Sequence, residues 1–162
     1  MYVNILLSTD GSDIARKGVK HGIALAKALN AKVTVITVTE PLPVYYGDGH
    51  ASGWIPSQEE FDRFDAACKE RAGKVLDEAR AMAEQTGIPV ELLHVPNAHP
   101  ATAMIETAKS RGCDLIVMGS HGRRGLTDRP PLSGPVGMLV HDRSRGDGWR
   151  CGRSGSGGLS RP

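Results

Sequence analysis

The chain has 162 residues, a common size for one domain with its own hydrophobic core, and no second domain is expected. Hydrophobic residues make up 40% of it and aromatic residues only 4%, which favours a layered α/β protein. The net charge is +2, but residues 143–162 hold five Arg against one Asp, so residues 1–142 carry −2. The charge therefore excludes binding to nucleic acid through a basic domain.

The first predicted elements form a βαβ unit. Residues 2–8 are an apolar run that stops at STDGS, as a buried strand does where it meets a loop. Apolar positions at helical spacing predict a helix over residues 12–29, with Ser12 or Asp13 available to cap it. Residues 32–39 (KVTVITVT) are dense in β-branched side chains and predict a second strand, parallel to the first.

A long loop and a long helix come next. Residues 40–56 are rich in Pro, Gly and Tyr and predict a flexible lid. Residues 57–86 carry an apolar stripe and end before Gly87, which predicts a helix. Residues 89–95 (PVELLHV) then read as the third strand.

The last regular pattern is a helix followed by a strand. Residues 100–111 have helical spacing with Pro in the first turn, and residues 114–118 (DLIVM) predict a fourth strand. The strands are continuously apolar and alternate with helices. This pattern predicts an α/β fold: an open, doubly wound parallel sheet with helices on both faces.

A glycine-rich segment, GSHGRRG, follows the fourth strand directly at residues 119–125. Such a turn can offer backbone N–H groups to a phosphate, because no Cβ blocks close approach. A plain strand-to-helix turn that needs positive φ would explain the same glycines without a ligand. The segment alone therefore leaves both interpretations open.

Three strand ends taken together resemble the universal stress protein family: STDGS, TVTEP and VMGSHGRRGL. The resemblance covers about residues 2–127. It implies the sheet order 3-2-1-4-5, so that the first and fourth strands are neighbours. Ligands of open α/β sheets bind beyond the strand ends at such a topological switch point.

The resemblance also implies a site for ATP, with or without Mg²⁺, or for a related adenine nucleotide. Asp10 would contact the nucleoside, Val38 would present backbone groups to the adenine edge, and the glycine loop would hold phosphates. The residues implied are Asp10, Val38, Met118, Gly119, Gly122, Arg123 and Ser133. Without a ligand, Asp10 would be a helix N-cap and Val38 an ordinary strand residue.

The chain departs from the family after about Thr127. Leu132 stands where the family has the glycine before Ser133, and neither a last helix nor a fifth strand is legible. We therefore expect the family's fifth strand to be missing, although residues 136–141 could still form a short helix or strand. A homodimer, which that strand commonly helps to form, stays in doubt.

Composition divides the chain into two parts. Residues 1–142 are expected to form the nucleotide-binding domain with a degraded end, and residues 143–162, rich in Gly, Arg and Ser, a disordered tail. A frameshift after Thr127 explains the abrupt change better than a natural low-complexity tail does.

The remaining residues bear on chemistry and location. Cys68, Cys113 and Cys151 have no spacing typical of a metal or redox site, so we expect reduced thiols and no metal. The first apolar run is too short for a signal peptide, and no run reaches membrane-spanning length, which predicts a cytoplasmic protein without a membrane partner.

The expected function is a nucleotide-binding protein in a stress or regulatory role. No paired carboxylates or catalytic base stand near the expected phosphates, so at most weak ATP hydrolysis is expected. The alternative is a family member that binds no nucleotide and acts through dimerisation or partner docking, which Leu132 favours.

Overall fold

The computed structural model describes residues 2–43, 55–119, 138–142 and 150–153 of the chain. Its elements are β1 (Asn4–Ser8), α1 (Asp13–Leu29), β2 (Lys32–Val38), α2 (Gln58–Thr86), β3 (Val90–Val95), α3 (Pro100–Ser110), β4 (Leu115–Gly119), β5 (Met138–Asp142) and β6 (Arg150–Arg153). Most of the expected lid, residues 44–54, lies outside the described residues.

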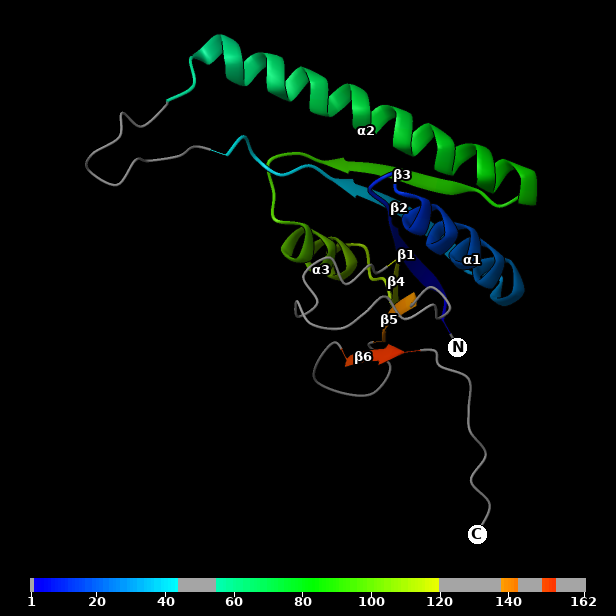
Figure 1. The fold of residues 1–162 in the computed structure, drawn as a ribbon. Helices are drawn as coiled ribbons and strands as arrows, with labels where there is room; N and C mark the ends of the chain where they lie inside the picture. Colours follow the sequence, from blue (N-terminus) through cyan, green and yellow to red (C-terminus); the bar gives the residue numbers. More distant parts are fainter. Residues whose placement is uncertain (1, 44–54, 120–137, 143–149, 154–162) are drawn as a thin grey trace, which may run out of the picture.

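The sheet has the order β3-β2-β1-β4-β5-β6. Strand β1 pairs in parallel with both β2 and β4, and β2 pairs in parallel with β3. Helices α1 and α2 cover one face, and α3 covers the other (Figure 1). The predicted parallel α/β sheet, with its first and fourth strands adjacent, is confirmed.

Two cores form because neighbouring strand residues point to opposite faces. Leu7 and Val35 belong to the core under α1 and α2. Leu6 and Ile36 belong to the core under α3, which also contains Met104. The continuous apolar runs in the sequence are explained by this burial on both faces.

Both long helices are bounded by residues that are typical helix caps. The Ser12 hydroxyl accepts a hydrogen bond from the Ala15 N–H at 3.3 Å, so Ser12 is the N-cap of α1. Helix α2 begins with a capping box between Ser57 and Glu60, and Gly87 ends it at φ 74°.

Helix α2 is longer than the sheet that it covers. Its 29 residues span about 43 Å, against about 20 Å for a strand of six residues. Its buried residues, Ala72, Leu76, Ala79 and Ala83, all lie in the second half. The first half therefore extends past the carboxyl ends of the strands (Figure 1).

Helix α1 lies unusually close to the sheet. A Cβ placed on Gly119 would lie 2.5 Å from the Ile14 carbonyl oxygen, and one on Gly18 would lie 2.9 Å from the Gly119 nitrogen. A Cβ on Gly22 would lie 2.3 Å from Leu7 Cδ2. These three glycines form a seam along which α1 rests directly on β1 and β4.

The expectation of a missing fifth strand is not met. Strand β5 occupies the fifth place, antiparallel to β4, and β6 pairs with β5. A short apolar run, Met138 to Val140, is enough to pair with the backbone groups on the open edge of β4. Strand β6 lies inside residues 143–162, and the rest of that range lies outside the described residues.

Candidate functional site

The loop after β1 holds Asp10 at the carboxyl edge of the sheet. The Thr9 N–H donates to the Ile36 carbonyl at 3.0 Å and so fixes the loop to β2. Asp10 Oδ1 accepts a hydrogen bond from the Ser12 N–H at 2.9 Å, which makes a side-chain turn before the helix. Asp10 is therefore not the N-cap, and its side chain is exposed at the strand end.

The same loop rests against α2. Gly11 has φ 77°, and a Cβ there would lie 2.7 Å from Val75 Cγ2. The Arg16 guanidinium also binds the Glu78 carboxylate with both Nε, at 2.8 Å, and Nη2, at 3.2 Å. Glu78 raises the pKa of Arg16 through this contact. The start of α1 is thus held beside the middle of α2.

The end of β2 turns backbone groups toward Asp10. The pairing of β1 with β2 ends at Ser8 and Ile36, and the last bond of this ladder uses the Ile36 carbonyl. Backbone groups two residues apart in a strand point to the same side. The N–H and C=O of Val38 therefore point to the β1 side, beyond the end of that strand, where Asp10 lies.

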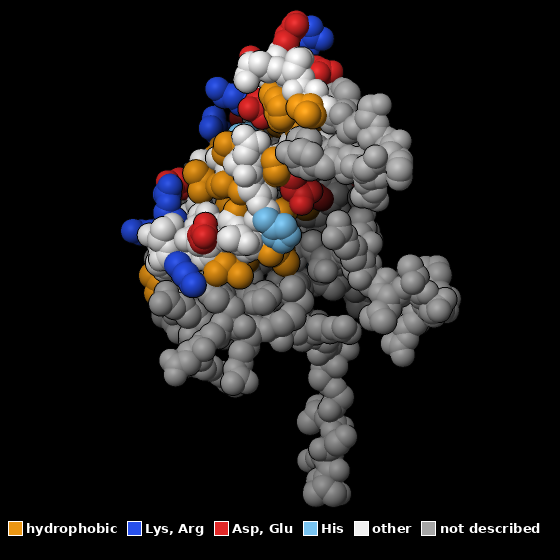
Figure 2. All heavy atoms as spheres, turned by 90° about the vertical axis from the view of Figure 1, so that its left-hand side faces the viewer, with side chains coloured by type: hydrophobic (Ala, Val, Ile, Leu, Met, Phe, Trp, Pro, Cys, Tyr) orange, Lys and Arg blue, Asp and Glu red, His pale blue; other side chains and the backbone are white. Residues whose placement is uncertain are grey.

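Asp10 and Val38 line one cavity of about 450 Å³. Its other lining residues come from the end of β2 and the segment after it, from α2 and from the start of α3: Thr37, Thr39, Glu40, Pro41, Pro43, Phe64, Cys68, Arg71, Ala72, Val75 and Pro100. Figure 2 looks at this end of the molecule and shows acidic side chains beside a histidine, with apolar side chains near them. The volume is in the usual range for a small-molecule site.

The end of β4 lies next to the end of β1. Ser8 pairs with Met118, so Gly119 follows at the level of the Asp10 loop. Met118 is half-buried and packs on the core under α3, as Val38 does. Met118 and Gly119 do not line the cavity that Asp10 and Val38 share. The structure thus brings two of the predicted residues into one cavity and places two at the neighbouring strand end.

Gly119 has a structural reason to be glycine. The Ile14 carbonyl occupies the place of its Cβ, so the close approach of α1 already excludes a side chain there. Gly122, Arg123 and Ser133 lie outside the described residues, and their predicted roles stay predictions.

Three cavity residues on α2 were missed by the sequence reasoning: Phe64, Cys68 and Arg71. They are spaced at i, i+4 and i+7, so they share one face of the helix. The sequence contained a signal for these residues, because the apolar stripe predicted over residues 57–86 begins before Ala72, the first residue that α2 buries.

Two described groups have shifted pKa values for reasons of burial. Burial first, and then the charge of Lys69, lowers the pKa of His94, whose ring contacts the Thr39 hydroxyl at 3.0 Å. Burial raises the pKa of Cys113 to about 11, so this thiol is unreactive at neutral pH. In the ranges that the structure describes, no group of three or more His, Cys, Asp or Glu is placed to hold a metal ion.

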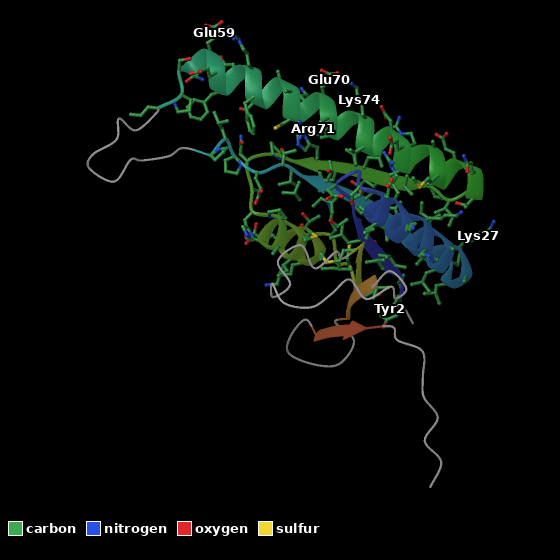
Figure 3. All side chains as sticks on the ribbon, viewed as in Figure 1. Tyr2, Lys27, Glu59, Glu70, Arg71 and Lys74 are labelled. Carbon is green, nitrogen blue, oxygen red and sulfur yellow. The ribbon has the colours of Figure 1, made fainter. Side chains whose placement is uncertain are left out.

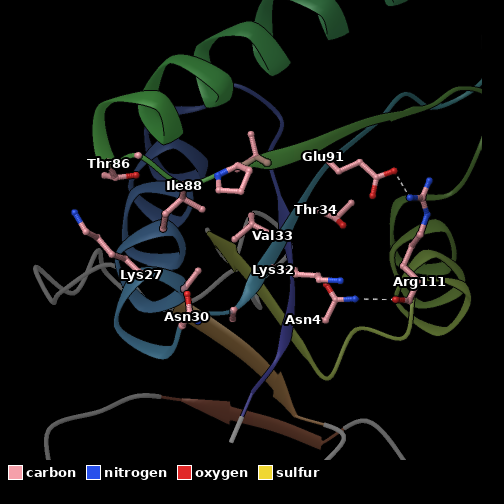
Figure 4. Close-up of a pocket in the computed structure, with 15 residues that line it drawn as sticks. Asn4, Lys27, Asn30, Lys32, Val33, Thr34, Thr86, Ile88, Glu91 and Arg111 are labelled. Carbon is pink, nitrogen blue, oxygen red and sulfur yellow. Dashed lines mark hydrogen bonds and ion pairs between the residues drawn. The ribbon is translucent and has the colours of Figure 1, made fainter.

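A larger cavity, of about 830 Å³, lies at the opposite end of the strands (Figure 4). Its lining includes Lys32, Glu91 and Arg111, and Arg111 is already paired with Glu91. The ends of α1 and α2 close one side through Asn30 and Gly87. This cavity is remote from the switch point, where open α/β sheets bind their ligands.

No helix among the described residues is both long enough and apolar enough to cross a membrane. This observation agrees with the charged outer surface of α2, the longest helix.

Comparison with known proteins gives a consistent result. The model of the universal stress protein family matches residues 1–136. A universal stress protein of Thermus aquaticus is 38% identical over 125 residues, which are 75% of this chain and 80% of the relative. One of Methanocaldococcus jannaschii is 31% identical over 126 residues, covering 78% of this chain and 69% of the relative.

Solved structures agree on the fold. A protein of the same family from Burkholderia pseudomallei superposes with a TM-score of 0.60 at 24% identity, over 75% of this chain and 83% of the other. The family match and the parallel sheet with its first and fourth strands adjacent confirm the family that the sequence resembles. The chain belongs to the universal stress protein family.

Proposed function

We propose that this chain binds ATP or a related adenine nucleotide, with or without Mg²⁺, and that binding serves a regulatory role in the cytoplasm with little or no catalysis. The observation that carries the proposal is the shared cavity of Asp10 and Val38 at the switch point. The N–H donor and the C=O acceptor of Val38 point toward the region where the exposed Asp10 carboxylate lies. Such a pair fits the edge of adenine.

Under this proposal, each part of the nucleotide would bind a different group of residues along the strand ends. The Val38 N–H and C=O would bind the adenine edge, and the Asp10 carboxylate would accept hydrogen bonds from ribose hydroxyls. Phosphates would then lie toward the turn that begins at Gly119, with Gly122, Arg123 and Ser133 as their expected contacts. Gly119 also adjoins the first turn of α1, and a helix N-terminus favours negative charge.

Proteins of the same fold support the ligand class. A universal stress protein solved in complex with cAMP superposes with a TM-score of 0.56 at 24% identity. An Arabidopsis thaliana family protein solved with AMP bound superposes with a TM-score of 0.54 at 13% identity. Both ligands carry adenine and ribose, the two parts that Val38 and Asp10 would bind under this proposal.

The test is calorimetric titration of the full chain with ATP and AMP, together with mass analysis of any nucleotide that co-purifies. Asp10→Asn should weaken binding about tenfold, because hydrogen bonds to a charged acceptor contribute about 1.5–3 kcal/mol. Asp13→Asn is the matched control, since Asp13 is exposed, pairs with Arg16 and does not line the cavity. Absence of both heat and co-purified nucleotide for the unmodified chain would refute the proposal.

A second candidate is a family member that binds no nucleotide and acts through a homodimer or a docked partner. Two observations favour it: packing against α1 already accounts for Gly119, and Leu132 replaces an expected glycine. Sedimentation of the full chain with and without ATP separates the two. A dimer that forms without nucleotide, in a chain that binds none, would favour this second candidate.

A further inference from the structure

The first half of α2 overhangs the cavity that contains Asp10 and Val38. Phe64, Cys68 and Arg71 all line that cavity, although α2 buries nothing in this half. Val75, one turn after Arg71, lies against Gly11 next to Asp10 and lines the same cavity. The helix therefore covers the cavity from the side opposite to β2.

Arg71, like Lys69, is not among the cations of α1 and α2 that form ion pairs in the described residues. Arg16 pairs with Glu78, Arg63 with Glu59, and Lys74 with Glu70. The ion pairs recorded among the described residues leave Arg71 out, although Asp10 and Glu40 line the same cavity. Figure 3 shows Glu70 and Lys74 on the outer side of α2 and Arg71 on the side that faces the sheet.

The charges in the cavity indicate which part of a nucleotide Arg71 can meet. Two carboxylates, Asp10 and Glu40, oppose a phosphate group there. The adenine base is uncharged and planar, and a guanidinium group stacks well on such a ring. Phe64 offers a second flat surface on the same helix face.

We propose that the face of α2 bearing Phe64, Cys68 and Arg71 forms the outer wall of the nucleoside subsite, with the Arg71 guanidinium stacked on the adenine base. This inference rests on the proposed function and adds the element that selects a planar base. The Val38 backbone then forms hydrogen bonds with the edge of the base, and the Arg71 guanidinium stacks on its face.

The first test compares adenosine, AMP and ribose 5-phosphate as ligands of the full chain. Arg71→Gln should weaken adenosine and AMP by the same factor, about three- to tenfold, and leave ribose 5-phosphate unchanged. Arg80→Gln is the matched control, because Arg80 is an exposed arginine of α2 outside the cavity. A loss for AMP without a loss for adenosine would assign Arg71 to the phosphate and overturn the inference.

The second test locates the ligand through Cys68, with Cys151→Ser in every sample. Cys113 is buried and its pKa is about 11, so N-ethylmaleimide should modify Cys68 selectively. Saturating adenosine should slow that modification at least about fivefold, and ribose 5-phosphate should not. Adenosine that binds without protecting Cys68 would overturn the inference alone, whereas a chain that binds neither adenosine, AMP nor ATP would overturn the proposed function as well.

Discussion

At the scale of single residues, Asp10 and Gly119 show how one sequence pattern can have two causes. Both follow neighbouring strands, as the family resemblance implies. Asp10 is exposed and lines a cavity, so its position suits a ligand. Gly119 is required by the Ile14 carbonyl whether or not a phosphate binds. A sequence motif alone could not separate these two cases, because the contact with Ile14 is a tertiary one.

His94 leads to a prediction on pH dependence. Burial and Lys69 lower its pKa in the folded state, so the unfolded chain takes up the proton first as pH falls through the ordinary value of 6.5. The free energy of unfolding should therefore decrease from pH 7.5 toward pH 5 and level off below the folded pKa. In His94→Gln, which can still bond to Thr39, part of this decrease should vanish in urea titrations. Equal slopes for the two proteins would contradict it.

At the scale of elements, the positions of the helices were easier to predict than their roles at the candidate site. Gly87 marked the end of α2, and of the two candidate caps for α1 the structure selects Ser12. The role of the first half of α2 could not be foreseen, because it depends on where the sheet ends beneath the helix. The roles of Val38 and Met118 likewise depend on strand pairing, which fixes the side to which each backbone and side chain points.

A glycine of the seam and an exposed glycine of α2 should respond in opposite ways to substitution by alanine. Gly119→Ala places a Cβ against the Ile14 carbonyl and should lower the free energy of unfolding by about 1–3 kcal/mol. Gly73→Ala, in an exposed part of α2 with no atom within 4 Å of the new Cβ, should raise it by about 0.5–1 kcal/mol. Urea unfolding measures both. A neutral Gly119→Ala would show that α1 can shift outward at little cost.

At the scale of the whole molecule, the sequence pattern predicted the parallel sheet and the family resemblance implied its switch point, but neither predicted the strands at the far edge. Residues after Thr127 lack the regular alternation of the first four strands, so no strand could be assigned there with a direction. The antiparallel pairing of β5 with β4 depends on an open sheet edge that only the assembled fold contains.

The pairing of β5 with the edge of β4 leads to a prediction for chains that are shortened at the C-terminal end. A chain that ends at residue 142 keeps β5 and should remain monodisperse in light scattering. A chain that ends at residue 137 leaves β4 unpaired along one side and should self-associate at lower concentration, because β4 presents a buried apolar strand with open backbone groups. Identical scattering from both chains would show that β5 does not protect the sheet.

The glycine seam also bears on which of the two helices on this face of the sheet can move. At Gly18 and Gly119, α1 and β4 meet backbone to backbone, with no intervening side chain that could rearrange. Helix α2 instead meets the loop after β1 through the Val75 methyl group and through a partly exposed ion pair from Arg16, both of which can adjust. A displacement of α2 relative to the sheet should therefore cost less free energy than one of α1.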